Sequence, residues 1–249
     1  MGGAVKDDLK LLRQFFQGGV FVLNENITIR HPTLGEICDF GEEGYYAMAT
    51  ALCAYPSLYK TSLHDIGVDY TQITDFDFFC LMSKNMAQGM TAPLLGDLDL
   101  SVLELGKNME NDEMVLFEAV DGEHKCVIDR AIYTEMVGYL RGIHGFEKKD
   151  EMPADEYTKN YLIERERKRI ARQRKTPFKS VLKPLISGMV NQPGFKYDYR
   201  TVWDLPIHIF NDSVHRTQKF LHYSNLMRGA YAGTVSLKEI NKDDLNWLG

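Results

Sequence analysis

Histidine is the residue type in this chain whose spacing comes closest to a metal-binding pattern. His208, His215 and His222 recur every seven residues in a segment with helical periodicity, and Asp212 and Lys219 stand between them. Residues seven positions apart lie on the same side of a helix but about 10 Å apart along its axis, so they cannot converge on one ion. The row therefore predicts an exposed or boundary stripe, and we expect neither a metal nor a cofactor.

The other candidates for ion binding or catalysis each lack an essential residue. Asp97–Ser101 begins like a calcium loop, but Val102 stands where glycine is needed and Asn108 where glutamate is needed. Gly41–Gly44 places two carboxylates where a phosphate-binding loop presents neutral amides. The four cysteines form no Cys-x-x-Cys pair, and no Gly-x-Ser-x-Gly motif occurs. We therefore expect no catalytic residue and a protein that is not an enzyme.

A run of basic residues could bind phosphate groups or an acidic protein. Between Lys159 and Lys175 there are eight basic and two acidic residues, and helical lysines and arginines commonly contact phosphate backbones. Glu164 and Glu166 precede basic residues by three or four positions, a spacing typical of a solvated helix. From Glu164 onward the run has no aromatic residue for base stacking. Two interpretations stay open: a solvated strut or acidic-partner site, and a nucleic-acid surface. The contact candidates are Arg165, Arg169 and Arg172.

Aromatic residues of the C-terminal part are candidate anchors for a partner protein. They flank a long helical segment on both sides, and tryptophan and tyrosine are enriched among the residues that dominate interface energetics. Two roles stay open for them: clamping the helix ends into a small core, and exposure to a partner. The candidates for partner contact are Trp203, Tyr231 and Trp247.

Two regions of different secondary structure must position these side chains. In the first, β-rich runs flank turn residues and predict two hairpins, at 20–30 and 114–128, with a further strand at 102–105. Thr33 and Glu36 predict a capping box. The predicted helices cover 7–17, 34 towards 54, a segment from 75, 129–141, 157–175, 180–190 and 204–228. The predicted fold class is α+β and predominantly helical, with a C-terminal helical region.

The charge of the chain divides at about the same place as the secondary structure. Residues 1–156 carry 12 Lys and Arg against 27 Asp and Glu, a net charge of −15, whereas residues 157–249 carry 17 against 8, a net charge of +9. We predict an acidic α+β domain at 1–146, a linker at 147–156 and a basic helical region at 157–249. Opposite charges at the two ends indicate contacts with partners or between copies of the chain.

The composition is that of a globular protein with no membrane segment. Hydrophobic residues make up 44% and charged residues 26%, which are ordinary values for folded domains. The longest charge-free stretch, Gly44–Tyr59, has 16 residues and contains Pro56, whereas a membrane span needs about 20 apolar residues. The N-terminus lacks the apolar stretch of a signal peptide. We therefore expect an intracellular location without membrane contact.

Two segments resemble phage proteins. Ile27–Tyr46 resembles the opening of proteins encoded in the tail-gene modules of long-tailed phages and prophages of Gram-positive bacteria, in which an extended strand leads into a capped helix. The tail Phe210–Leu248, with Met227–Gly233 and the final Asp-Leu-Asn-Trp-Leu, is similar to proteins of that kind. The nearest family is the tail assembly chaperones, helical proteins without catalytic residues.

The resemblance implies binding to the tape measure protein and help in assembling tail tube subunits around it. We therefore expect a non-enzymatic, chaperone-like tail assembly factor in the cytoplasm of the bacterial host. The alternative is a structural virion component or a nucleic-acid-binding protein that uses the basic helix at 159–175.

Overall fold

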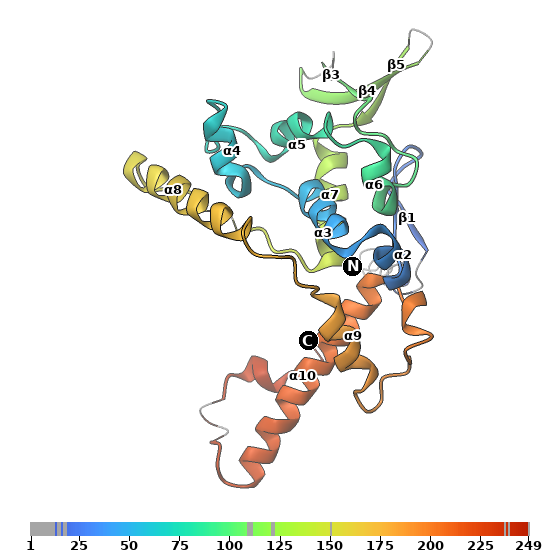
Figure 1. Cartoon of the computed structure of the whole chain (residues 1–249), viewed down its shortest axis with the longest axis vertical. Helices are drawn as coiled ribbons and strands as arrows, with labels where there is room; N and C mark the ends of the chain where they lie inside the picture. Colours follow the sequence, from blue (N-terminus) through green and yellow to red (C-terminus); the bar gives the residue numbers. More distant parts are fainter. Residues whose placement is uncertain are drawn as a thin grey trace, which may run out of the picture.

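The computed structural model contains an α+β body from which helices extend (Figure 1). It describes Arg13, Phe16, Lys238 and residues 19–108, 112–120, 123–149, 151–236 and 240–248. Helices predominate, accompanied by one two-stranded and one three-stranded sheet, which confirms the predicted fold class. The predicted helix at 7–17 lies outside the described residues except for Arg13 and Phe16.

The first predicted hairpin is confirmed. Strands β1 (Val20–Val22) and β2 (Thr28–Arg30) pair antiparallel, with Phe21 opposite Ile29. The Asn24 side-chain oxygen closes the turn by accepting bonds of 2.9 Å from the backbone N–H groups of residues 26 and 27. Phe21 and Ile29 point the same way and are buried, so one face of this small sheet contributes to the core.

A capping box begins the next helix, but the helix ends earlier than predicted. The Thr33 hydroxyl accepts from Glu36 N at 3.2 Å, and Glu36 Oε2 accepts from Thr33 N at 2.9 Å. Gly41 then interrupts the predicted helix with φ of 97°, a conformation that only glycine adopts without strain. The chain therefore forms two helices, α2 (Leu34–Phe40) and α3 (Glu42–Leu52).

The rest of the body packs around helix α7 (Arg130–His144). Its other elements are η1 (Pro56–Tyr59), α4 (Lys60–Asp65), α5 (Asp75–Ser83), α6 (Gln88–Leu95), β3 (Glu104–Lys107), β4 (Met114–Val120) and β5 (Glu123–Ile128). Strands β4 and β5 form the second predicted hairpin, and β3 begins two residues later than expected and pairs with β4. Asp129 caps α7 by accepting from Ile132 N at 2.8 Å, and left-handed Gly145 ends it. The buried face of α7 lies in the main core.

Helix α8 (Glu156–Gln173) lies against α4. Ile163 is its one buried residue, and it packs with Leu63 and Phe78 in a small second cluster. Thr61 Oγ1 donates to Ile163 O at 3.3 Å. The predicted basic helix is thus present, docked on the body by one apolar side chain and by polar contacts.

The C-terminal elements share the main core of the body at their near end. They are α9 (Leu182–Val190), η2 (Val202–Asp204), α10 (Ile207–Tyr231) and η3 (Lys242–Leu245). Leu182, Ile186, Leu205 and Phe210 belong to the same buried cluster as residues of α2 and α7. In α10, which is described throughout, no residue after Phe210 is buried, and the helix extends away from the body (Figure 1). The predicted linker at 147–156, between an acidic domain and a basic helical region, stays a prediction.

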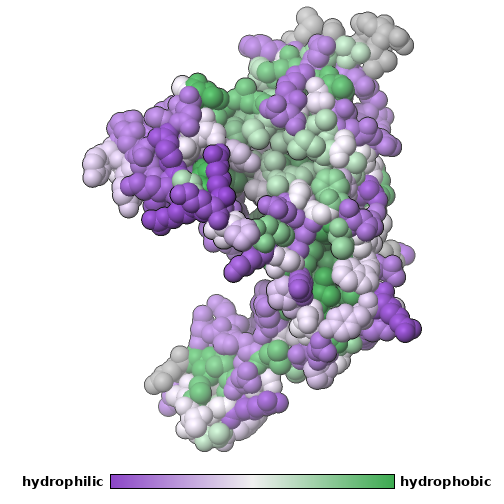
Figure 2. Space-filling view, viewed as in Figure 1, coloured by the Kyte–Doolittle hydropathy of each residue, from purple (hydrophilic) through white to green (hydrophobic). Residues whose placement is uncertain are grey.

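The space-filling view shows a hollow between α8 and the far end of α10 (Figure 2). The surface over α8 is mostly hydrophilic, whereas hydrophobic residues gather on the lobe at the end of α10. Among the described residues, no helix is long and apolar enough to cross a membrane.

Replacement of Ile163 by alanine should loosen α8 without unfolding the body. Ile163 is 2% exposed, and removal of a buried isoleucine side chain costs about 2–5 kcal/mol. We expect faster hydrogen exchange of the α8 amides and unchanged exchange in α7. Tyr161→Ala, which truncates an exposed side chain of the same helix, is the control. Equal α8 exchange rates in the two variants would contradict this docking.

Candidate partner-binding site

The structure separates the three candidate arginines of α8 into paired and unpaired cations. The Arg165 guanidinium donates to both carboxylate oxygens of Glu151, at 2.9 and 3.0 Å. Arg169 binds Glu166, with its shortest contact at 2.6 Å. Arg172 is exposed and forms no ion pair with any described residue. Arg172 is thus the one of the three whose charge is not already neutralised by a neighbouring carboxylate.

Several cations of α8 bind the acidic body. Lys159 donates to Asp69 at 2.7 Å, and this bond is the main reason that the pKa of Asp69 falls to about 2. Arg167 contacts Glu164 and Asp65. The same pattern extends to the predicted linker, because Glu151 accepts from both Lys60 and Arg165. Hydrogen bonds from these two, the Lys60 bond first, lower the pKa of Glu151. These pairs set the direction of α8 on the body.

The unpaired cations lie at the C-terminal end of α8. Lys168 and Arg172 are four positions apart, so they share one side of the helix, and Lys175 follows two residues after the helix ends. All three are exposed, and none pairs with a carboxylate in the described part of the chain. The sequence predicted ion pairs from Glu164 to residues three and four positions later, and the structure forms the first, with Arg167.

The three candidate aromatic residues lie at separate places. Trp203, in η2, is 39% exposed, and its indole Nε1 donates to Tyr199 O at 2.9 Å. Tyr231 ends α10 and is 85% exposed. Trp247 packs edge-on against Phe220 of α10, with ring centroids 5.4 Å apart. The structure does not bring the three into one patch, so they belong to at least two surfaces.

Trp203 lines an apolar groove between α2, α9 and η2. The groove has a volume of about 430 Å³, within the range of ligand and peptide pockets. Its apolar lining comes from Leu34, Cys38, Leu182, Ile186, Tyr199 and Trp203. Sequence reasoning identified Trp203 alone, because α2 and α9 lie about 140 positions apart and no local pattern links them.

Glu42 holds the two sides of this groove together. Its Oε1 accepts from Val181 N at 2.7 Å and from Leu182 N at 2.9 Å, where α9 begins. A carboxylate at a helix N-terminus satisfies free N–H groups and interacts favourably with the helix dipole. Glu42 is thus engaged in capping α9, while Lys183, also in the lining, forms no ion pair with a described residue.

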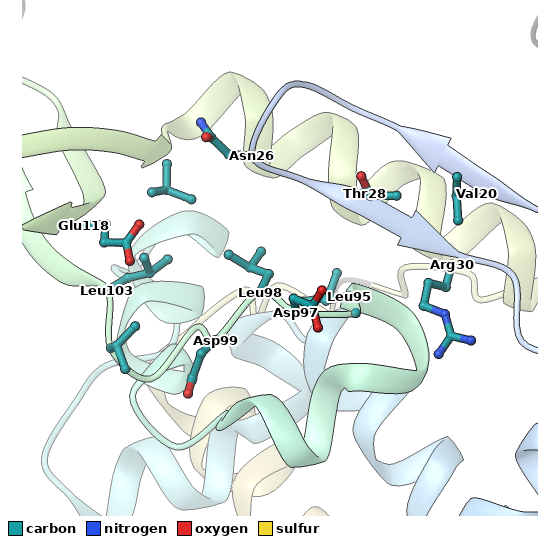
Figure 3. Close-up of a pocket in the computed structure, with 13 residues that line it drawn as sticks. Val20, Asn26, Thr28, Arg30, Leu95, Asp97, Leu98, Asp99, Leu103 and Glu118 are labelled. Atoms are coloured by element: carbon teal, nitrogen blue, oxygen red, sulfur yellow. The ribbon is translucent and has the colours of Figure 1, made fainter. Parts of the chain in front are cut away.

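A larger cavity lies between the β1–β2 hairpin, the end of α6 and the three-stranded sheet (Figure 3). Its volume is about 590 Å³, and Asp97, Asp99 and Glu118 are among its polar lining residues. Asp99 Oδ1 accepts from the Ser101 hydroxyl and N–H, at 2.6 and 2.9 Å, and these bonds lower the Asp99 pKa. The segment that begins like a calcium loop is therefore a turn. The described residues contain no metal-binding group of three or more His, Cys, Asp or Glu.

The histidine row is only partly on the surface. His215 and His222 are exposed, and His222 lies 3.6 Å from Asp244. His208 is buried, with its ring 4.3 Å from that of buried His31. The prediction of an exposed or boundary row is wrong for His208, because the first turn of α10 enters the core. Periodicity could not reveal this, since the partner surface comes from residues near position 31.

Two buried histidines have uncharged hydrogen-bond partners. His144 Nε2 lies 2.7 Å from the Tyr45 hydroxyl, and Nδ1 lies 2.7 Å from Leu140 O. His31 Nε2 lies 2.7 Å from the Tyr139 hydroxyl. Burial is the main cause that lowers the pKa of both histidines to about 4. Both therefore remain uncharged near neutral pH and serve the packing of the core.

The comparisons with known proteins concern the C-terminal part of the chain. A family model described as the YomV second domain matches residues 173–249, and this match indicates a phage-associated protein. The matched segment includes α9, η2 and α10, and hence one wall of the groove and Trp203. No curated protein and no solved structure matches the chain. The phage association expected from the sequence thus has support, while the tail-gene module stays a prediction.

The free energy of unfolding should fall as the pH drops below the ordinary histidine pKa. His31 and His144 titrate near 6.5 when unfolded and near 4 when folded, so the unfolded chain binds more protons between these values. Their contribution is complete above pH 6.5 and declines as the pH falls towards 4. Urea unfolding at pH 7, 6 and 5 measures it, and we expect a smaller loss in His144→Gln. A free energy that is constant from pH 7 to 5 would contradict the prediction.

Proposed function

We propose that this protein is a non-enzymatic phage tail assembly factor, chaperone-like, that binds tape measure or tail tube proteins in the cytoplasm of the bacterial host. The observation that carries the proposal is the unburied length of α10. After Phe210 this helix continues to Tyr231 without one buried residue. A helix of this kind gains little from its own chain, because helical stability in proteins comes mostly from packing of an apolar face.

The exposed half of α10 carries apolar side chains that suit contact with another protein. Phe220, Leu221 and Tyr231 are exposed. The segment after α10 returns along it and covers part of this surface, with Trp247 against Phe220 and Arg216 Nη1 donating to Leu248 O at 2.7 Å. A partner protein could bury the apolar area that the returning segment leaves open.

The similarity to a phage-associated domain points in the same direction. It covers the whole of α10 and the returning segment, and in this stretch no described residue after Phe210 is buried. Binding of a hydrophobic phage protein during assembly fits such a surface better than catalysis does, because no catalytic motif stands in these residues.

Co-expression with the tape measure protein or tail tube protein of the same phage genome tests the proposal. We expect a complex on size-exclusion chromatography and more soluble tape measure protein. Combined replacement of Trp203, Tyr231 and Trp247 by alanine should weaken the complex about tenfold or more, because aromatic anchors dominate interfaces.

The matched control replaces two exposed tyrosines of α8, Tyr157 and Tyr161, by alanine and should leave binding unchanged. Absence of a complex with both proteins, and of any gain in solubility, would refute the assembly role.

A second candidate function is nucleic-acid binding, alone or as a structural virion component. The observation that favours it is the set of unpaired cations at the end of α8: Lys168, Arg172, Arg174 and Lys175. They are exposed and follow one another within eight residues, so a phosphate backbone could contact several at once.

Duplex DNA binding at increasing salt concentration tests this second function. If the cations contact phosphates, affinity should fall steeply with salt, with a slope of about −0.9 per phosphate contacted. Lys168→Glu/Arg172→Glu/Lys175→Glu should abolish binding. Arg165→Glu/Arg169→Glu should weaken it less, because both guanidinium groups already bind carboxylates. Absence of DNA binding at low salt would dismiss this function. The copy number of this protein in purified phage particles would distinguish a virion component from an assembly factor.

A further inference from the structure

We propose that the groove between α2, α9 and η2 binds a segment of a partner protein that combines an apolar side chain with a neighbouring carboxylate. The apolar side chain would lie among Leu182, Ile186 and Trp203, and the carboxylate would bind Lys183. This inference rests on the proposed function only in that the occupant is a protein. It goes beyond that function by naming the binding site and the chemistry of the segment that binds there.

The groove is held open by contacts of its own walls. Glu42 binds the first N–H groups of α9 and so fixes α9 to the start of α3. Trp203 is fixed by its bond to Tyr199 O, and the Tyr199 hydroxyl accepts from Asn191 Nδ2 at 3.0 Å. Because these side chains are already ordered, a ligand would bind without the cost of ordering them.

Apolar surface extends beyond the groove itself. Phe178 and Val181, outside the lining, are exposed, as are the lining residues Tyr199 and Trp203. They stand just before α9 and around η2, the same elements that line the groove. An apolar patch around a preformed pocket is typical of a protein contact, with the pocket receiving one anchor side chain. A segment of a polypeptide therefore fits this surface better than a small molecule does.

The charge on the C-terminal side of the groove favours an acidic segment. Residues 174–203 contain six Lys and Arg and one Asp, and none of the six cations pairs with a carboxylate in the described parts of the chain. The single acid, Asp198, accepts from Arg200 N and Thr201 N. Within the lining, Glu42 caps α9 and leaves Lys183 as the charge without a partner. A carboxylate of the partner would complement it.

A nucleic acid fits this place less well than a protein does. Phosphate groups could contact the surrounding cations, but the floor of the groove is formed by Leu34, Leu182 and Ile186, and its two exposed aromatic rings are fixed in the walls. Single-stranded nucleic acids are bound by aromatic platforms on which successive bases stack. The combination of an aliphatic floor with one unpaired ammonium group is suited to an amino-acid side chain followed by an acidic residue.

The first experiment uses a fragment of the expected segment. The full chain, labelled with ¹⁵N, is titrated with N-acetyl-leucine and with N-acetyl-leucinamide, and the indole N–H of Trp203 and the amides of α9 are followed by NMR. We expect both probes to shift these signals, with the carboxylate binding about two- to fivefold tighter, as one exposed ion pair allows.

Lys183→Gln should remove the difference between the two probes, and Lys168→Gln, a matched change of an exposed lysine outside the groove, should preserve it. Both residues are exposed, so neither change should impair folding. Unshifted groove signals, or equal affinity of the two probes for the unmodified chain, would overturn the inference.

The second experiment uses the tape measure complex and separates this inference from the proposed function. Lys183→Glu and Trp203→Ala should each weaken the complex, Trp203→Ala by about tenfold, while Lys84→Glu, at an exposed lysine of the acidic body, should not. A complex that forms equally well with the groove variants overturns the groove and leaves the function standing. Absence of any complex with the unmodified chain, while the fragment still binds, refutes the function and retains the groove.

The other occupants give distinct results. Self-association that disappears in Lys183→Glu would identify a second copy of this chain as the ligand. Displacement of N-acetyl-leucine by duplex DNA would identify a nucleic acid. Either result would overturn the assignment of the groove to an acidic partner protein.

Discussion

Two backbone hydrogen bonds hold the C-terminal region against the body. Leu34 N donates to Leu205 O at 3.0 Å, and Ile207 N donates to Pro32 O at 2.9 Å. They join segments more than 170 positions apart, so forming them costs substantial loop-closure entropy. Burial of Leu205, Ile207 and Phe210 at the same place offsets that cost. Because α2 and α10 both begin here, these bonds also set the directions of the two helices.

The groove is a consequence of this junction. The chain before α10 passes so close to α2 that a Cβ at Gly35 would lie 3.1 Å from Trp203 O, so a larger residue there would require the chain at Trp203 to shift by a few tenths of an ångström. The same approach brings Trp203 beside Leu34 and brings α9 within reach of Glu42. The groove is thus built from both parts of the chain, and the segment with phage similarity supplies only one of its walls.

Features that depend on near neighbours could be predicted from the sequence, and features that depend on distant contacts could not. The capping box of Thr33 and Glu36 and the Asp129 cap involve residues three positions apart, so the pattern contains the whole interaction. The break at Gly41 was missed because a single glycine is also tolerated inside a helix, as Gly44 is in α3. The role of Glu42 was also missed, since its partners lie 139 and 140 positions away. The pair of Arg169 with Glu166 could be predicted from their spacing of three positions, whereas the pair of Arg165 with Glu151, 14 positions away, could not.

The opposite charges of the two halves are partly used inside the molecule. Lys159, Arg165 and Arg167 bind carboxylates of the acidic part. Most of these pairs are exposed and contribute little to stability, so their main effect is to orient α8. The positive charge that remains unpaired begins at Lys168 and continues through the chain around the groove. The segments with unpaired positive charge and exposed aromatic residues therefore lie next to or within residues 173–249, which the phage-associated family model matches. This coincidence makes the C-terminal region, and not the acidic body, the part of the molecule suited to meet an acidic partner.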